Sequence, residues 1–337
     1  MGAQHSHRVI AVIVTYADRR ALVNSVLQTL PEQGVTSVVV VDNGAVWPVR
    51  EELAAKYGDF VDVIDLGRNT GSAVGFASGI QHALDLGADY IWLLDDDNRP
   101  CGHALTKLRD AMAEVAADTP HDRLAVLAFR PEHQADVAAG VPSHRINPRP
   151  DSFRGFHILD IPYKIWRRTP WGRPRVRGQL PATVVLEQAP YSGLLFHRDL
   201  ISRIGLPNAA FVLYADDTEF SYRVTEIGGQ IRLVTSAVLD DLESSWNTKA
   251  RFRNGFAGML RGAGDFRAYY GMRNGAHFDD THLKRNPFVF WLNRTVYMRL
   301  LSLFSVALGQ RRRYQLLREA VRDGLSGRLG VNRNFPL

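Results

Sequence analysis

Short runs of β-branched residues alternate with helix-like stretches through the first half of the chain. The runs that read as buried strands are Val9–Thr15, Ser37–Asp42, Val61–Leu66, Tyr90–Leu94 and Leu124–Phe129. The stretches with helical character between them are Arg19–Leu30, Glu51–Tyr57, Gly75–Leu86 and Leu105–Ala116. Apolar strands alternating with helices are typical of a parallel sheet covered by helices. The pattern therefore predicts an α/β layer.

This rhythm stops at residues 130–185, which are rich in Pro, Arg and aromatic residues and have little periodicity. A stretch of that length inside a compact domain is usually functional or disordered. Its aromatic residues favour an ordered flap that contacts a substrate. Regular structure is expected again at Thr183–Leu186, Ser192–His197, Asp199–Ile204, Glu219–Ile227 and Ile231–Val234.

A long helix is predicted to begin after Asn286, a good N-cap, with Pro287 in its first turn, and to end at Gly309. At 100° per residue, one face carries Val289, Val296, Leu300, Phe304 and Ala307. The other face carries Arg294, Thr295, Arg299, Ser302 and Ser305. Two arginines within the helix argue against a membrane span. The helix therefore either docks on the domain or lies in a membrane interface.

Charge is distributed unevenly along the 337 residues, whose net charge is +6. Residues 251–337 hold 16 Lys and Arg against 5 Asp and Glu, whereas residues 1–250 hold 25 against 30. We therefore expect two regions that meet at residue 250, and we expect the second region to be basic and helical. A basic arm suits an anionic partner such as nucleic acid, acidic lipid headgroups or a phosphorylated substrate, and it also suits a solvated basic helix.

The chain has one cysteine, Cys101, which excludes an internal disulfide framework and every multi-cysteine metal motif. The N-terminus lacks a signal-peptide pattern. We expect a reducing, cytoplasmic compartment.

Three carboxylates follow the strand Tyr90–Leu94, namely Asp95, Asp96 and Asp97. In α/β folds the carboxyl edge of the sheet is where ligands bind. Adjacent like charges raise each other's pKa unless they share a cation, and Mg²⁺ is typically held by one or two carboxylates plus phosphates. This pattern favours a metal–phosphate site over a simple acidic turn.

A second acidic group, Asp216-Asp217-Thr218-Glu219, precedes a predicted helix. One Asp could cap the helix while the other points into a cleft as a proton acceptor. Simple capping with a Glu219–Arg223 pair explains the same residues equally well.

Other chemistries find little support. Residues 68–79 form a glycine-punctuated helix entry that could receive phosphate, but the pattern is not GxGxxG and has no Walker lysine. No HExxH or GxSxG motif occurs. Dinucleotide-dependent oxidoreductases and the common hydrolases are therefore disfavoured.

Taken in order, these motifs resemble glycosyltransferase family 2. The residues that carry the resemblance are Val14-Thr15-Tyr16, Val41-Asp42-Asn43-Gly44, Asn69/Gly71/Gly75, Leu94–Asp97, Tyr191-Ser192-Gly193 and Asp216-Asp217-x-Glu219. Two further motifs are similar to bacterial rhamnosyl- and galactofuranosyltransferases, namely Tyr269-Tyr270-x-x-Arg273-Asn274 and Asp323-Gly324-Leu325-x-Gly327-Arg328.

The resemblance implies a GT-A fold, which is a Rossmann-like mixed sheet, here in residues 1–250, with a helical basic extension in residues 251–337. It implies transfer with inversion from a UDP- or dTDP-linked sugar, with Mg²⁺ or Mn²⁺, to a lipid-linked or glycan acceptor. The setting would be cell-envelope polysaccharide synthesis, at the inner face of the plasma membrane, and residues 130–185 would face the acceptor.

The resemblance also assigns roles to residues. The donor would be bound by Thr15, Asp42, Asn69, Gly71, Asp95 and Asp96. Asp217 would be the general base, supported by Asp216. The metal ligands would be Asp97, Asp95 and Asp240. Arg273, Asn274 and Trp246 would serve the acceptor or the structure.

One position departs from the family, whose members often carry a metal-binding His where this chain has Asp240 in Ala237-Val238-Leu239-Asp240. Asp is still an oxygen ligand for Mg²⁺ or Mn²⁺. The departure keeps open a non-catalytic nucleotide- or carbohydrate-binding relative. A sugar-phosphate nucleotidylyltransferase is the other enzyme alternative, but Thr15–Arg20 lacks the glycines such enzymes need. Nucleic-acid binding rests on the basic arm alone, and we expect none.

Overall fold

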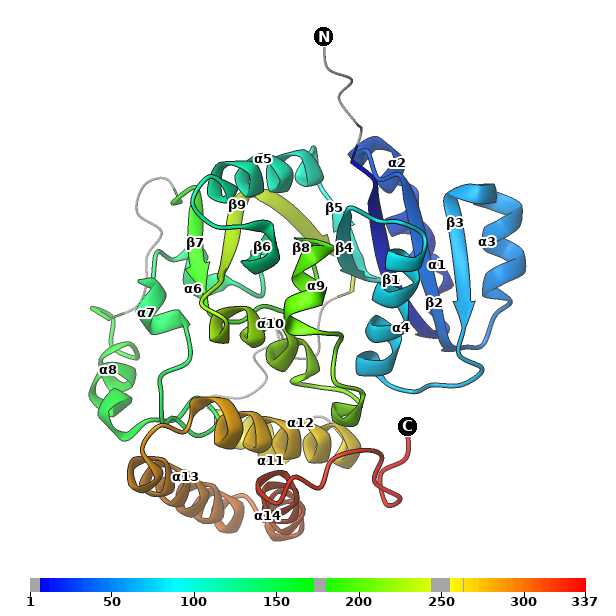
Figure 1. Cartoon of the computed structure of the whole chain (residues 1–337). Coiled ribbons are helices and arrows are strands. Elements are labelled where there is room, and N and C mark those ends of the chain that lie inside the picture. Colours follow the sequence, from blue (N-terminus) through cyan, green and yellow to red (C-terminus); the bar gives the residue numbers. More distant parts are fainter. Residues whose placement is uncertain (1–6, 173–179, 244–254, 263) are drawn as a thin grey trace. The chain divides into compact units, whose positions relative to one another are not determined.

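The computed structural model describes residues 7–172, 180–243, 255–262 and 264–337 (Figure 1). These form two compact units. The first unit comprises the described residues within 1–134, 180–209 and 216–244. The second comprises those within 135–179, 210–215 and 245–337, so the predicted flap groups with the C-terminal region.

The first unit is built on a nine-stranded sheet of described residues in the order β3-β2-β1-β4-β8-β6-β9-β5, with β7 paired to β9. Its strands are β1 (Val9–Ala17), β2 (Ser37–Ala45), β3 (Val61–Asp65), β4 (Tyr90–Asp95), β5 (Asn98–Pro100), β6 (Leu124–Phe129), β7 (Thr183–Leu186), β8 (Leu194–His197) and β9 (Gln230–Asp241). Strands β1 to β4 pair in parallel, whereas β8 runs antiparallel between β4 and β6. The antiparallel β8 makes the sheet mixed, as the resemblance implies, whereas the alternating pattern indicated only its parallel part. That strand comes from much later in the chain, and local periodicity does not report long-range pairing.

The helices of the first unit are α1 (Arg20–Leu27), α2 (Leu30–Gln33), α3 (Val49–Tyr57), α4 (Ser72–Asp85), α5 (Ala104–Ala116), α9 (Asp199–Ile204) and α10 (Asp216–Glu226). Two glycines let α4 lie directly on the sheet. A Cβ at Gly79 would meet the Val12 side chain at 2.4 Å, and one at Gly75 would meet the Val14 side chain at 2.7 Å. This close packing fixes the start of α4 beside the ends of β1 and β2.

The second unit is helical, as predicted for the C-terminal region. Its helices are α6 (Ala135–Ala138), α7 (Ser143–Ile146), α8 (Ile161–Trp166), α11 (Gly255–Arg261), α12 (Asp265–Phe278), α13 (Pro287–Ala307) and α14 (Arg311–Leu325). Its core joins the flap to the C-terminal helices, because Phe153 and Val212 are buried in one cluster with Tyr270, Leu301 and Leu317. No helix in the described part of the chain is long and apolar enough to cross a membrane.

The start of α13 is confirmed, because the Asn286 side chain accepts hydrogen bonds from the amides of Phe288 and Val289 at 3.0 and 3.2 Å. The predicted faces of this helix are wrong. Its buried residues are Phe290, Asn293, Tyr297, Leu301 and Ser305, so the buried stripe is rotated from the expected one and includes two polar side chains. Asn293 finds buried partners, and this lets a polar residue occupy a core position.

Candidate active site

The carboxyl ends of β1, β2 and β4 lie side by side and carry the predicted site residues. Thr15 pairs in register with Asp42, and Val14 pairs with Asp95. The order β2-β1-β4 therefore brings the three motifs that follow these strands to one edge of the first unit. This is where ligands of α/β sheets bind.

Asp96 points inward and is fully engaged with protein groups. It is 3% exposed. It accepts hydrogen bonds from the Thr15 hydroxyl at 2.9 Å and from the Arg19 Nε at 2.7 Å. Burial raises the pKa of Asp96 to about 7, and Arg19 lowers it in part. Arg19 also reaches Asp97 at 3.2 Å and Glu243 at 2.7 Å. Arg19 therefore ties the acidic strand end to the end of β9, and sequence reasoning did not single it out.

Asp95 and Asp97, on either side of Asp96 in the chain, are partly buried. The Ser192 hydroxyl contacts Asp95, and the Asn98 side-chain amide donates to Asp97 at 3.1 Å. Burial and the nearby Asp95 charge raise the pKa of Asp97 to about 6. Arg19 and Arg130 lower that pKa but do not cancel the effect. Burial is the larger of these causes, and repulsion between the two carboxylates adds to it.

At the end of β9 the two neighbouring aspartates point to opposite faces. Asp240 is about half exposed and pairs with Arg99 at 3.2 Å. The Asp241 side chain is 4% exposed and accepts hydrogen bonds from the Asn98 side-chain amide and from the Arg130 Nε, both at 2.8 Å. The His133 Nε2 lies 3.4 Å from its other carboxylate oxygen. The structure therefore groups Asp241, and not the predicted Asp240, with the charges around Asp97. Neighbouring residues of a strand point to opposite faces, which separates Asp240 from Asp241.

The loop before α4 is fixed to the end of β2 by Asn43. The Asn43 Oδ1 accepts from the amide of Thr70 at 2.7 Å, and its Nδ2 donates to the carbonyl of Gly71 at 3.2 Å. Asn69 is exposed and accepts from the Gly71 amide at 3.0 Å. Asp42 accepts from the amide of Ala45 at 2.8 Å. Asp42, Asn69 and Gly71 are therefore brought together as predicted, with Asn43 as the residue that holds them.

Asp216 and Asp217 occupy the first turn of α10 but differ in surroundings. Asp216 is 2% exposed and accepts from the Ser72 hydroxyl at 2.8 Å, whereas Asp217 is half-buried and accepts from the Thr218 amide at 2.7 Å. Burial and the Asp217 charge raise the pKa of Asp216 to about 8. Burial and the charge of Asp95 raise the pKa of Asp217 to about 6. Asp216, the more deeply buried of the two, thus has the higher pKa. The Glu219–Arg223 pair of the capping alternative is also present, at 3.1 Å.

In the second unit, Arg273 and Asn274 hold the segment that leads into α10. The Asn274 side-chain amide donates to the carbonyls of Phe211, Leu213 and Tyr214 at 2.7, 2.8 and 2.9 Å. The Arg273 Nε donates to the Asn274 Oδ1 at 2.8 Å and so orients the amide. This segment has three non-glycine residues in the left-handed region, Val212, Tyr214 and Ala215. Such backbone strain persists where surrounding contacts impose it. Trp246 lies outside the described residues.

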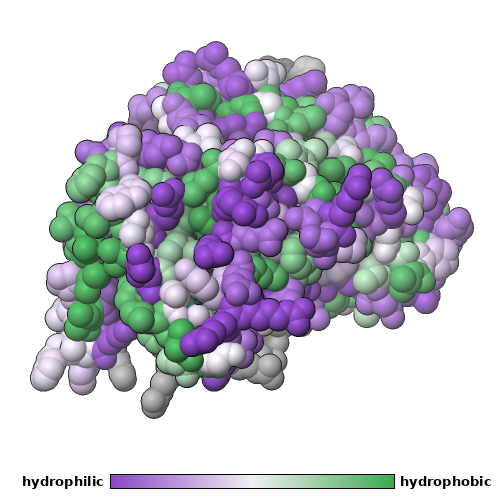
Figure 2. All heavy atoms as spheres, turned by 90° about the horizontal axis from the view of Figure 1, so that it is seen from below, coloured by the Kyte–Doolittle hydropathy of each residue, from purple (hydrophilic) through white to green (hydrophobic). Residues whose placement is uncertain are grey.

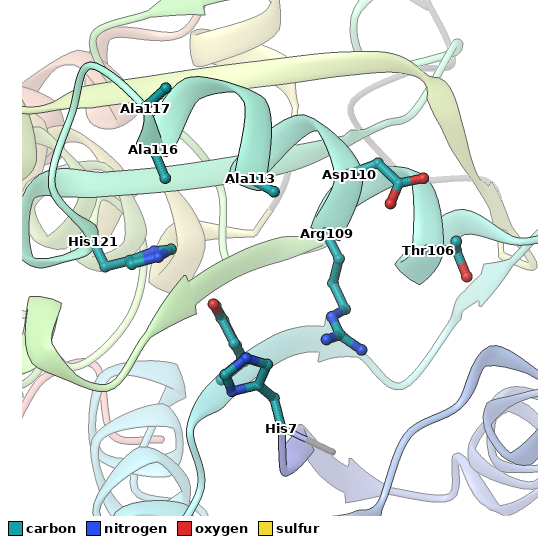
Figure 3. Close-up of a pocket in the computed structure, with 9 residues that line it drawn as sticks. His7, Thr106, Arg109, Asp110, Ala113, Ala116, Ala117 and His121 are labelled. Carbon is teal, nitrogen blue, oxygen red and sulfur yellow. The ribbon is translucent and has the colours of Figure 1, made fainter. Parts of the chain in front are cut away.

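A cavity of about 660 Å³ opens at the other end of β4, beside Tyr90 (Figure 3). In Figure 3, Arg109 and Asp110 come from α5, His121 from the segment that follows α5, and His7 from the residues before β1. None of the predicted site residues lines this cavity. The carboxylate edge is therefore the candidate active site.

Comparison with known proteins indicates which families this chain is similar to. Residues 11–165 match the model of Glycosyl transferase family 2. Galactofuranosyltransferase GlfT1 of Mycolicibacterium smegmatis is 28% identical over 232 residues, which are 66% of this chain and 67% of that protein. dTDP-rhamnosyl transferase RfbF of Shigella flexneri is 37% identical over 100 residues, 30% of this chain and 33% of the relative. A crystal structure of GalNAc-T7 with UDP, GalNAc and Mn2+ superposes with a TM-score of 0.50 at 14% identity, covering 83% of this chain and 52% of that one.

The fold and these matches define the chain as a glycosyltransferase with the GT-A fold and a helical C-terminal region. Within that class it resembles glycosyl transferase family 2 and, more narrowly, galactofuranosyl- and rhamnosyltransferases. The chain spans about two thirds of the length of GlfT1, a third of RfbF and half of GalNAc-T7.

Proposed function

We propose that the chain is an inverting, metal-dependent glycosyltransferase. It would move a galactofuranose- or rhamnose-like sugar from a UDP- or dTDP-linked donor to a hydroxyl of a lipid-linked or glycan acceptor. The observation that carries this proposal is that Ser72, in the first turn of α4, donates to Asp216 at 2.8 Å, which places the start of α10 beside the carboxyl ends of β1 and β2. The same edge of the sheet thus combines carboxylates for a metal–diphosphate group with a carboxylate suited to accept a proton.

The donor would lie along the ends of β1, β2 and β4. Its base and ribose would contact Thr15 and Asp42, with the Asn69–Gly71 loop beside them. Asp95 would meet the ribose or the diphosphate. Asp96, already bonded to Thr15 and Arg19, would act by holding Thr15 in place.

The donor set at this edge fits a hard divalent cation. Asp95 and Asp97 supply carboxylate oxygens. Burial raises the pKa of Asp97, and the charge of Asp95 adds a repulsion that a cation would relieve. The described residues contain no group of three or more His, Cys, Asp or Glu that could hold a metal alone. Mg²⁺ commonly takes one or two carboxylates and completes its shell with substrate phosphates. When bound, such an ion would stabilise the charge of the leaving diphosphate.

Asp217 would remove the proton of the acceptor hydroxyl as that oxygen attacks the anomeric carbon opposite the leaving diphosphate. A single displacement of this kind inverts the configuration. Protonated Asp216 would support Asp217 without competing for the proton. General-base catalysis of this kind contributes on the order of 10²–10⁴ in rate.

The acceptor is proposed to be membrane-linked, with the chain bound peripherally at the inner face of the plasma membrane and working in cell-envelope polysaccharide synthesis. The names of the relatives, a galactofuranosyltransferase and a dTDP-rhamnosyl transferase, support this choice of sugar. The flap within residues 135–172 and the helical second unit are where the acceptor would be recognised.

Replacing Asp217 by Asn tests the proposal most simply. We expect kcat for sugar transfer or donor hydrolysis to fall on the order of 10²–10⁴-fold while nucleotide binding is retained. Asp216→Asn is the matched control. A neutral amide replaces a protonated carboxyl there, so we expect a loss of about tenfold or less. If Asp217→Asn turned over like the wild type, or if the wild type bound nucleotide without any turnover, the non-catalytic relative would be the better description.

A further inference from the structure

Helix α13 exposes large apolar side chains along the face that is turned away from its own core. Phe288, Trp291, Leu303 and Val306 are 67, 49, 67 and 53% exposed. With Arg299 between them they recur at helical spacing on the side opposite Tyr297 and Leu301. We call these five residues the outer face of α13. Figure 2, viewed from below, shows apolar atoms directly beside hydrophilic ones.

The contacts on the buried side of α13 fix this orientation. The Asn293 Oδ1 accepts from the Ile158 amide at 2.9 Å, and its Nδ2 donates to the Asp151 carbonyl at 2.8 Å. Phe256 packs on Tyr297 and stacks on Phe304, with ring centroids 5.2 Å apart in both pairs. Rotating the outer face inward would break a buried hydrogen-bonded pair and this aromatic packing, and neither loss would be compensated. The apolar side chains of the outer face therefore stay exposed to solvent.

The surroundings of the outer face are strongly basic. Residues 281–318 hold eight Lys and Arg side chains and no Asp or Glu. Lys284 pairs with Asp280 and Arg313 with Asp265. Five exposed guanidinium groups of this stretch make no ion pair with any described residue. Arg285 precedes α13 and Arg299 lies within it, and the other three lie in α14, namely Arg311, Arg312 and Arg318.

We propose that the outer face of α13 binds the surface of an anionic lipid bilayer, with Phe288 and Trp291 entering the headgroup region and the arginines contacting lipid phosphates. Aromatic side chains beside basic ones are typical of helices that lie in a membrane interface, and long Arg side chains can reach headgroups while their stems stay apolar. This inference rests on the proposed membrane contact and names its surface, but it does not depend on the carboxylate chemistry.

A second copy of the chain fits this face less well. A symmetric dimer through the outer face would bring two acid-free, arginine-rich surfaces together, and like charges at an interface oppose association. An anionic bilayer supplies both the apolar environment and the opposite charge.

Vesicle cosedimentation of the full chain tests the proposal, with phosphatidylcholine vesicles that contain or lack phosphatidylglycerol. We expect binding to the anionic vesicles that weakens at high salt. The double variant Phe288→Ser/Trp291→Ser should bind at least about tenfold more weakly. Arg299→Glu should bind about fivefold or more weakly to anionic vesicles. The matched control is Val46→Ser/Val331→Ser, which removes two exposed apolar side chains elsewhere and should bind like the wild type.

The proposal is overturned if the wild type ignores anionic vesicles, or if the Phe288/Trp291 variant binds them like the control. It is also overturned if sedimentation velocity without lipid shows a dimer that this variant abolishes, because a second copy would then be the occupant. Calorimetric nucleotide binding by the same variants separates this question from the proposed activity. Lost vesicle binding with intact nucleotide binding supports the surface, and absent nucleotide binding in all proteins would count against the activity alone.

Discussion

Asp216 and Asp217 are chain neighbours whose surroundings separate their protonation. Asp216 is enclosed and bonded to Ser72, whereas Asp217 is half-buried and feels the charge of Asp95. Placing one neutral and one charged carboxyl side by side is a common way to assign acid–base roles. Which of the two carboxyl groups is ionised therefore decides which one can act as the base.

The pH dependence of turnover follows from that difference. Because the pKa of Asp217 is raised to about 6, the ionised base is present above that pH and lost as the pH falls through it. We expect kcat to be level near pH 7 and to fall about tenfold per pH unit below about pH 6. Initial rates of transfer at saturating substrate measure this. A kcat that stays level down to about pH 4.5 would show that a carboxylate with an ordinary pKa, or no base, serves the reaction.

At the scale of elements, the segment before α10 is held by a side chain distant in sequence. Asn274 bonds three carbonyls between Phe211 and Tyr214, and the segment ends one residue before Asp216. We propose Asn274 as a positioning residue for the start of α10. The left-handed conformations of Val212, Tyr214 and Ala215 would relax without it.

Replacing Asn274 by Ala should therefore lower kcat about tenfold or more while the nucleotide dissociation constant changes little, because the loop and not the donor loses its contact. Ser305→Ala is the matched control, since Ser305 is also buried in the second unit but bonds only to its own helix. Steady-state kinetics and calorimetry separate the two effects. An equal loss of kcat in Asn274→Ala and Ser305→Ala would show that Asn274 only stabilises the fold.

The sequence predicts most strands of the first unit, and the start of α13 in the second, because each has a local pattern. The strands at Val9, Ser37, Tyr90 and Leu124 and the cap at Asn286 all have signals within a few residues. The insertion of β8 between β4 and β6 has no local signal, nor has the burial of Asn293.

The same limit applies within the site. The motif aspartates could be named from the sequence. Arg19, Arg130 and His133 contact aspartates that are distant in the sequence, so only the fold shows these pairs. Whether Asp240 or Asp241 faces inward depends on the exact register of β9 against β5, which the sequence does not encode locally.

For the whole molecule, the boundary expected at residue 250 cuts through the core of the second unit. Phe153 and Val212 are buried against helices of residues 255–337. A protein ending at residue 250 should therefore expose this apolar cluster, self-associate and lose protease protection within residues 135–172. Limited proteolysis and sedimentation against the full chain measure this. A monomer with the protection pattern of the full chain would show that residues 1–250 fold on their own.

The most direct test of the proposed activity is a calorimetric titration of the full chain with UDP and with dTDP, each with and without Mn²⁺, repeated for Asp97→Asn. The account predicts that one of the two nucleotides binds tightly in a metal-dependent manner, and that Asp97→Asn weakens this binding on the order of 10–100-fold. Metal-independent binding, or equal affinity of Asp97→Asn and the wild type, would contradict a metal–diphosphate site at Asp95 and Asp97.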